Sequence, residues 1–345
     1  MKSLYKRFNE LKSEEEIEPM DVSEEEKEAM KQQVRMKIQR RRRVPRVWRN
    51  VAAAAVITVA SVTAVGIGFP TLASQIPIVS NIFSIFNEDQ DGFYTDYEEY
   101  AVDIAESQTS KGITIMVDRA VYDGKTVTLT YSVETAKELG QNAGVNSPMD
   151  IKHTNGSSGT STALKKVADN KYVGMITTTP DFDKKPDFVD VSWVPDSIVN
   201  YDTMKETAGD WEFHFKLKPV TGDVQLVDQS AAKRGVKITI EEIRFTEIST
   251  IIEYSQKVDS AVTDEWEWVT ADLAVKDNLG NEYLSNGNGG FSENGQDYHF
   301  STTLKKIDKE ATSLIFTPEI YMYNGSGNKN ETVMLEPIEI ELVKK

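Results

Sequence analysis

The acidic stretch NEDQDGFYTDYE, residues 87–98, has the residue spacing of a calcium-binding loop. The matching positions are Asn87, Asp89, Asp91, Gly92 at the sixth position and Glu98 at the twelfth. Position one is usually Asp, and position eight, here Tyr94, is usually aliphatic. The stretch predicts either a calcium site or an acidic turn that keeps the chain solvated. We assign no metal and no cofactor to it.

Groups that could carry out catalysis are few in this chain of 345 residues. It has no cysteine, which removes disulfides, thiolate metal sites and cysteine nucleophiles. Its three histidines, His153, His214 and His299, have no second histidine at ligand spacing. No G-x-S-x-G motif, phosphate-binding loop or dinucleotide fingerprint is found in the sequence. We therefore expect no catalytic residue and expect that the protein is not an enzyme.

Two apolar stripes at helical spacing precede residue 40 and could bind a partner protein. The stripes consist of Leu4, Phe8 and Leu11 and of Met30, Val34 and Ile38. The second begins after Ser23, with Glu26 three residues later, which is a capping-box pattern. A segment of this length cannot build a large core of its own. We expect the stripes to bind a partner, to pack on each other or to lie on the membrane surface.

An uncharged stretch of 19 residues, Val51–Phe69, predicts a membrane-spanning helix at 50–69. Such a helix would be about 28 Å long, close to the thickness of a hydrocarbon core. Basic residues and one interfacial tryptophan flank its N-terminal side: Arg40, Arg41, Arg42, Arg43, Arg46, Trp48 and Arg49. The positive-inside rule then places the N-terminus in the cytoplasm and residues 70–345 outside the cell membrane.

Other interpretations of this stretch fit less well. A cleaved signal peptide has a short N-terminal region, whereas about 50 residues precede this stretch. A nucleic-acid-binding arm would need free arginines, but the membrane span would hold them at the lipid surface. The charge distribution agrees with two compartments: residues 1–50 carry 14 Lys/Arg against 10 Asp/Glu, while residues 70–345 carry 25 against 45. We therefore expect membrane contact and no direct nucleic-acid binding.

Two tandem copies of one β domain are predicted at 110–221 and 231–345. The first begins with alternating Ile113, Ile115 and Val117, a hairpin signal of type I′ at Asp123-Gly124, and a return strand. A constant offset of 123 residues relates matching positions of the two copies: Gly112 and Gly235, Ile115 and Ile238, Tyr122 and Phe245, Leu129 and Ile252, Tyr131 and Tyr254, Trp193 and Phe316, and Pro195 and Pro318. The short strands and turn signals indicate antiparallel immunoglobulin-like β-sandwiches. Residues 70–109 are predicted to form an amphipathic stalk, with helical spacing at Tyr97, Tyr100, Ala101 and Ile104.

The layout resembles a family of Bacillus-type single-pass membrane proteins that carry a domain of unknown function after the span. The resemblance lies in the basic segment, the span ending GFP, then LASQIPIVSNIFSIF, DYEEYA and KGITIMVDRAVYDGKTVTLTYSV. Some members are anti-sigma factors for extracytoplasmic-function sigma factors, including the sigma-M type. The resemblance implies that residues 1–45 bind a sigma factor. Many anti-sigma factors have a zinc-binding His/Cys motif in the cytoplasmic part, but residues 1–50 contain neither residue, so a sigma contact would be zinc-free.

Two functions therefore remain open at this point. The chain is expected to be a membrane-anchored regulator, an anti-sigma factor whose extracellular β domains sense the state of the envelope. The alternative is a surface-anchored extracellular binding module, of unknown ligand and without a sigma partner. The two differ in whether the cytoplasmic segment has a soluble partner.

Overall fold

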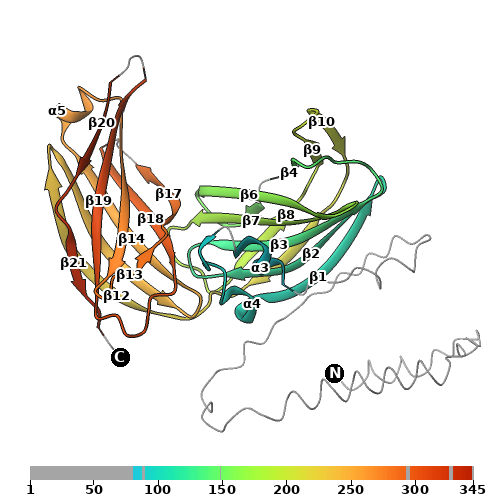
Figure 1. The fold of residues 1–345 in the computed structure, drawn as a ribbon, viewed down its shortest axis with the longest axis horizontal. Coiled ribbons are helices and arrows are strands. Elements are labelled where there is room, and N and C mark those ends of the chain that lie inside the picture. The colour runs from blue at the N-terminus through green and yellow to red at the C-terminus, as the bar shows by residue number, and fades with distance from the viewer. Residues whose placement is uncertain (1–80, 88–89, 148, 293–295, 326–328, 344–345) are drawn as a thin grey trace, which may run out of the picture. The chain divides into compact units, whose positions relative to one another are not determined.

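A computed structural model describes residues 81–87, 90–147, 149–292, 296–325 and 329–343. These residues belong to one compact unit by their mutual contacts. They form mostly antiparallel strands with short helices between them (Figure 1), so the prediction of a mainly β fold is confirmed. The predicted cytoplasmic segment, 1–49, and the predicted membrane helix, 50–69, lie outside the described residues. No helix within the described ranges is long and apolar enough to cross a membrane.

The first half of the fold, strands β1–β11, is called repeat 1. Its larger sheet has the order β1 (Val102–Ser110), β2 (Ile113–Tyr122), β3 (Val127–Thr135), β7 (Lys171–Asp181) and β6 (Gly156–Ala168). One smaller sheet has the order β10 (Lys205–Ala208), β9 (Ser197–Asn200) and β4 (Ala143–Asn146). The other has the order β11 (Phe213–Leu217), β8 (Val189–Trp193) and β5 (Met149–Ile151). Inward side chains of all three sheets form one core, as expected for strands that bury alternate residues.

The second half, strands β12–β21, is called repeat 2. Its first sheet has the order β12 (Gly222–Lys233), β13 (Val236–Thr246), β14 (Ser249–Val258), β18 (Asp297–Lys305) and β17 (Asn286–Ser292). Its second sheet has the order β16 (Glu282–Tyr283), β15 (Trp268–Asp277), β19 (Ser313–Asn324) and β20 (Lys329–Met334), with β21 (Ile338–Glu341) also paired to β19. A short helix, α5 (Ser260–Thr263), follows β14. The two sheets share one core and form a sandwich-like arrangement.

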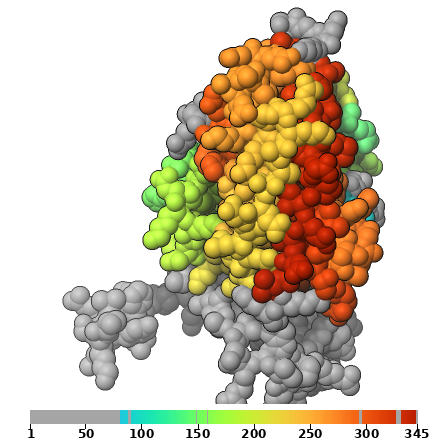
Figure 2. Space-filling model, turned by 90° about the vertical axis from the view of Figure 1, so that its left-hand side faces the viewer, coloured from blue at the N-terminus to red at the C-terminus, as the bar shows by residue number. Residues whose placement is uncertain are grey.

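One lateral edge of this sandwich is closed by a side chain. The Gln225 amide of β12 donates to the Glu341 carbonyl of β21 at 2.8 Å, and its carbonyl accepts from the Val343 amide at 3.1 Å. Figure 2 shows β12 in yellow beside the C-terminal strands in red. The first and last strands of repeat 2 are thus joined across its two sheets.

The two repeats share strand order and local irregularities. The larger sheet has the order β1-β2-β3-β7-β6 in repeat 1 and β12-β13-β14-β18-β17 in repeat 2. In both sheets the last two strands therefore lie in the reverse of their order along the chain. Bulges fall at Asp103/Glu106 and Leu226/Gln229, and again at Val117/Arg119 and Ile240/Glu242, each pair 123 residues apart in number. The first hairpin turn is Lys111-Gly112 in one repeat and Arg234-Gly235 in the other, and all four residues have positive φ. Both residues of a two-residue type I′ turn require this conformation.

The segment before repeat 1 differs from the predicted stalk. It contains two short helices, α3 (Ile82–Asn87) and α4 (Tyr97–Tyr100). The predicted helical spacing through Ala101 and Ile104 is wrong, because Val102–Ser110 is a strand paired with β2. In a similar way, β12 begins at Gly222, whereas the second copy was predicted to begin at 231. The alternation in both first strands is weak because each is an edge strand with one mostly exposed face.

Candidate functional site at the junction of the two repeats

Most site residues predicted from the sequence lie outside the described residues. This holds for the two apolar stripes and for the arginines and Trp48 that flank the predicted span. Their predicted roles in partner binding and membrane topology therefore stay predictions.

The calcium-like loop contains ligand positions that are already engaged with cations or with the backbone. The Asn87 side chain accepts from the Tyr94 amide at 2.8 Å. The Asp91 carboxylate pairs with Lys305 Nζ at 2.6 Å, and Glu98 pairs with Arg119 at 3.1 Å. No group of three or more His, Asp or Glu suited to a metal ion occurs in the part of the chain that the structure describes. The described part of this loop favours the interpretation as an acidic turn.

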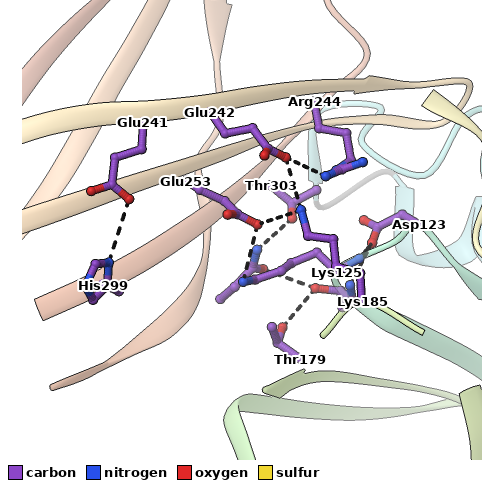
Figure 3. Close-up of polar contacts among 12 residues, drawn as sticks. Asp123, Lys125, Thr179, Lys185, Glu241, Glu242, Arg244, Glu253, His299 and Thr303 are labelled. Atoms are coloured by element: carbon purple, nitrogen blue, oxygen red, sulfur yellow. Dashed lines mark hydrogen bonds and ion pairs between the residues drawn. The ribbon is translucent and has the colours of Figure 1, made fainter. Parts of the chain in front are cut away.

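The three histidines sit on exposed surfaces of different elements. His214 contacts Glu212 at 2.7 Å, and His299 lies 3.7 Å from Glu241 (Figure 3). His153 has a positive φ in the turn after β5. Two of the histidines thus contact nearby glutamates, and among the described residues the fold does not gather the three into a metal site.

Two equivalent hairpin turns, one from each repeat, meet at the junction. In repeat 1 the Asp123 carboxylate accepts from the amides of Lys125, at 2.8 Å, and Thr126, at 2.6 Å. In repeat 2 the Thr246 hydroxyl accepts from the amide of Ser249 at 2.9 Å in the same way. The Ser249 hydroxyl then donates to Asp123 Oδ2 at 3.2 Å, which links the two turns directly.

The turn of repeat 1 is not the predicted type I′ turn. A type I′ turn needs a positive φ at both central residues, but only Gly124, with a φ of 96°, has one and Asp123 does not. In addition, four residues rather than two join β2 to β3. The extra length lets Asp123 fold back and accept hydrogen bonds from its own turn. Asp123 is 1% exposed. Burial raises the pKa of the Asp123 carboxyl, although the hydrogen bonds from Thr126, Lys125 and Ser249 act in the opposite direction.

A cluster of charged side chains surrounds these turns (Figure 3). Lys185 of repeat 1 pairs with Glu242 at 3.1 Å and with Glu253 at 3.5 Å, both of repeat 2. Lys125 of repeat 1 lies 3.6 Å from Glu253, and Arg244 pairs with Glu242 within repeat 2. Burial alone would raise the pKa of Glu253, but Lys125, Lys185 and Arg244 outweigh it and hold the pKa below its ordinary value. The charges of the two repeats are therefore complementary at the junction.

Uncharged polar groups extend the junction between β6 and β17. The Thr126 hydroxyl contacts the Thr179 hydroxyl at 2.8 Å and the Asn288 carbonyl oxygen at 3.4 Å. The Asn288 amide in turn donates to the Thr303 hydroxyl at 2.8 Å. A Cβ at Gly159 would lie 2.7 Å from the Asn288 backbone oxygen, so glycine is required for this close approach.

An apolar cluster covers the other side of the junction. The helical segment, defined as residues 82–87 and 90–100, contributes buried aromatic side chains: Phe83, Phe86, Phe93, Tyr94 and Tyr97. They pack with Val121, Val173 and Met175 of repeat 1 and with Ile248 of repeat 2. The Tyr100 hydroxyl contacts Glu247 at 3.4 Å, and Lys305 pairs with Asp91 at 2.6 Å. The helical segment is therefore bonded to both repeats.

Tyr97 connects the apolar and polar parts of the junction. Its side chain is 2% exposed and lies against Phe83 and Tyr94, with ring centroids 5.8 and 5.1 Å away. Burial and the nearby Asp123 carboxylate raise the pKa of the Tyr97 hydroxyl well above its usual range. The hydroxyl therefore stays protonated, and the junction has a continuous set of contacts from the helical segment to both turns.

The junction links the two repeats and the helical segment through side-chain contacts. Its acids, bases and hydroxyls are bonded to one another across the junction. Sequence reasoning did not identify it, because Lys125, Lys185, Glu242 and Glu253 look like ordinary surface charges. The equivalent turns at offset 123 were the one available signal, and they indicate homology of the turns without showing that they touch.

The fold and the junction define a class of mainly β proteins in which a helical segment precedes two copies of one strand arrangement and packs against both. A domain of unknown function, DUF4179, matches residues 42–135, and a family of unknown function, DUF5643, matches residues 222–342. The crystal structure of the conserved domain protein from Bacillus anthracis is similar, at 30% identity and a TM-score of 0.72. The match covers 77% of this chain and 100% of that one. The chain belongs to the same family as this Bacillus anthracis conserved domain protein.

Other comparisons add little. The crystal structure of collagen adhesin from S. aureus matches at 10% identity with a TM-score of 0.14, covering 70% of this chain and 97% of that one, which is too low for an argument. No curated protein matches the chain.

Proposed function

We propose that the protein is a membrane-anchored regulator, an anti-sigma factor whose residues 1–49 hold an extracytoplasmic-function sigma factor in the cytoplasm. Residues 50–69 cross the cell membrane once in this proposal. The two repeats lie outside as immunoglobulin-like sandwiches and sense the state of the envelope. The domain that matches residues 42–135 is often linked to anti-sigma factors, which supports the proposal.

The observation that carries the proposal is the position of the helical segment. In the sequence it follows the proposed span by about a dozen residues, and its aromatic side chains pack on both repeats. A ligand or stress that changes the contact between the repeats would therefore act on the chain next to the membrane. A simple surface anchor would need no such packing.

The test is recovery of a sigma factor by the full chain. Detergent-solubilised wild-type protein is used as bait in cell lysate, and bound proteins are identified by mass spectrometry. The double variant Met30→Asp, Val34→Asp places charges on the predicted apolar stripe and is expected to reduce sigma recovery by about tenfold or more, since a buried unpaired charge is costly. The matched control, Gln32→Asp with Met36→Asp, places the same charges on the opposite side of the predicted helix and is expected to retain binding.

A wild-type bait that recovers no sigma factor overturns the anti-sigma proposal. Equal sigma-factor recovery by both double variants would instead mean that the stripe of Met30, Val34 and Ile38 does not contact the sigma factor. In the first case the alternative function, a surface-anchored binding module, becomes the better account of the two repeats.

A further inference from the structure

The outward face of the second sheet of repeat 2 carries an unusual group of exposed side chains. We call it the aromatic face and define it by Trp268, Thr270 and Asp272 of β15 and Glu319, Tyr321 and Tyr323 of β19. The strand register places them in three cross-strand rows: Trp268 opposite Tyr323, Thr270 opposite Tyr321, and Asp272 opposite Glu319. The alternate residues Val269, Ala271 and Leu273 point inward to the core of repeat 2.

The aromatic rings on this face are exposed to an extent that packing does not explain. Trp268 is 62% exposed, Tyr323 is 50% exposed and Tyr321 is 40% exposed. Trp193, Trp211 and Trp266 are, by contrast, at most 3% exposed. Large aromatic side chains normally bury most of their area, and their exposure in a contiguous group is typical of a binding surface.

The third row has two carboxylates directly opposite each other. Like charges at paired positions of a sheet destabilise it, and within the described ranges neither Asp272 nor Glu319 forms an ion pair. The Tyr321 hydroxyl donates to Glu319 Oε2 at 2.6 Å, which fixes the ring beside this row. The Asp272 carboxylate accepts from the Leu273 amide at 2.8 Å, so within the described ranges each carboxylate keeps one oxygen beside the exposed rings that a ligand can use.

A groove continues the face along the same strands. It has a volume of about 470 Å³ and is lined by Asp272, Ala274, Glu319, Glu282 and Leu284, among others. From Trp268 to Ala274 the strand extends about 20 Å. Rings, carboxylates and groove thus form a track long enough for several units of an extended polymer.

The carboxylates and aromatic rings along this surface favour some classes of ligand and disfavour others. The carboxylates of Asp272, Glu319 and Glu282 disfavour nucleic acids, anionic lipids and other polyanions. A second copy of this face would bring carboxylates against carboxylates, and an apolar protein surface would bury them unpaired. A pyranose ring offers both matching features, because its flat face of C–H groups stacks on aromatic rings while its hydroxyls donate to carboxylates.

We propose that the aromatic face binds an uncharged polysaccharide built of pyranose units. The polymer lies along β15 and β19 with sugar rings stacked on Trp268 and Tyr323. Hydroxyls of the following units donate to Asp272 and Glu319. This binding does not depend on the partner of residues 1–49, so it stands or falls separately from the sigma-factor proposal.

The test is titration calorimetry of the full chain in detergent micelles with the hexamer of β-1,4-linked N-acetylglucosamine as the probe. Trp268→Ala and Tyr323→Ala are each expected to weaken binding about tenfold, which corresponds to about 1.4 kcal/mol. Tyr323→Phe keeps the stacking ring and is expected to bind as the wild type does. The matched control is Tyr201→Ala, which removes a tyrosine of repeat 1 that is 56% exposed and is expected to leave binding unchanged.

A second readout separates binding from folding. Trp268 is the exposed tryptophan of the described part of the chain, so the hexamer is expected to shift the emission of the wild type and not of Trp268→Phe. The proposal is overturned if the wild type does not bind the hexamer at about 1 mM, a dissociation constant equivalent to about −4.1 kcal/mol. It is also overturned if Trp268→Ala binds equally well, or if hexalysine binds this face and the sugar hexamer does not.

Discussion

Repeat 1 and repeat 2 share their larger sheet but differ in the sheet packed against it. In repeat 2, β15 and β19 pair without interruption over ten positions. In repeat 1 the corresponding pairing is divided into β4 with β9 and β5 with β8. The sequence of repeat 1 has a proline between the strands on both sides, Pro148 and Pro195, whereas in repeat 2 Pro318 is the one proline in this strand pair. Because proline cannot donate a ladder hydrogen bond, a proline in the sequence of both sides favours a divided strand pairing over a continuous one.

The difference explains why the aromatic face occurs in one repeat. An unbroken strand pair presents its outward residues in straight rows, as Trp268, Tyr321 and Tyr323 are. In repeat 1 the divided strand pair places Gly144 opposite Val199. There Tyr201 lies over Gly144, where a Cβ would be 2.7 Å from the tyrosine ring. Two copies of one fold have thus kept the junction sheet and diverged on the opposite sheet.

The largest expected effect tests whether the two cores are equivalent. Trp193 and Phe316 are both 0% exposed and occupy matching positions. Trp193→Ala and Phe316→Ala are each expected to lower the free energy of unfolding by about 3–5 kcal/mol, because each leaves a large cavity. Urea denaturation measures the loss, and hydrogen exchange should show loss of protection mainly in the repeat that carries the substitution. Trp268→Ala is the control and should change stability little, since its ring is exposed.

The side chains at the equivalent turn positions, Asp123 and Thr246, are expected to contribute unequally to stability. Asp123→Ala leaves the amides of Lys125 and Thr126 and the Ser249 hydroxyl without their acceptor and is expected to cost about 2–3 kcal/mol. Thr246→Ala is expected to cost about 1 kcal/mol, as loss of a capping hydroxyl does. Thermal unfolding compares the two, with Asp123→Asn as the variant that keeps an acceptor for the turn. Equal stability of Asp123→Ala and wild type would contradict the role of the carboxylate.

The matching glycines of the first hairpins should respond unequally. Gly112 has a φ of 78°, and no atom lies within 4 Å of the place that an added Cβ would take, so Gly112→Ala should cost about 1 kcal/mol from backbone strain alone. At Gly235, with a φ of 75°, the new Cβ would also lie 2.7 Å from Val262 Cγ2. Gly235→Ala is therefore expected to cost about 2 kcal/mol. Urea denaturation of the two variants measures which substitution lowers the free energy of unfolding more. A larger loss of stability for Gly112→Ala than for Gly235→Ala would contradict the prediction.

The smallest effect concerns pH. The pKa of Glu253 is lowered in the folded state, so its charge stabilises the fold above the ordinary glutamate pKa of about 4.3, and this stabilisation is lost as pH falls through the folded value. Glu253→Gln is expected to cost up to about 1 kcal/mol at pH 7, because its ion pairs are partly exposed. The difference from wild type should vanish at lower pH, as measured by denaturation over a pH series. Glu310→Gln, at an exposed site without an ion pair in the described structure, is the control. A pH-independent difference would mean that packing, and not charge, is lost.

Much of the local structure follows from short-range sequence patterns. Alternation predicted that Ile113, Ile115 and Val117 would point to one side, and all three are fully buried. The offset of 123 predicted matched positions, and Gly112 and Gly235 both have left-handed conformations. Alternation failed at Val102–Ser110, where an edge strand with one solvated face resembles a helix in its apolar spacing.

The sequence by itself determined the mainly β class, the strands of the first hairpins and the equivalence of the repeats, because these depend on side-chain period and on turn residues close together in the chain. Only the tertiary structure decided that Asp123 contacts Ser249, that Lys185 pairs with Glu253, and that Tyr97 packs in one cluster with residues of both repeats. Contacts between residues this far apart depend on how the sheets pack, and surface charges of the same types occur throughout the chain. The aromatic face has the same origin, since only strand register brings Trp268 opposite Tyr323.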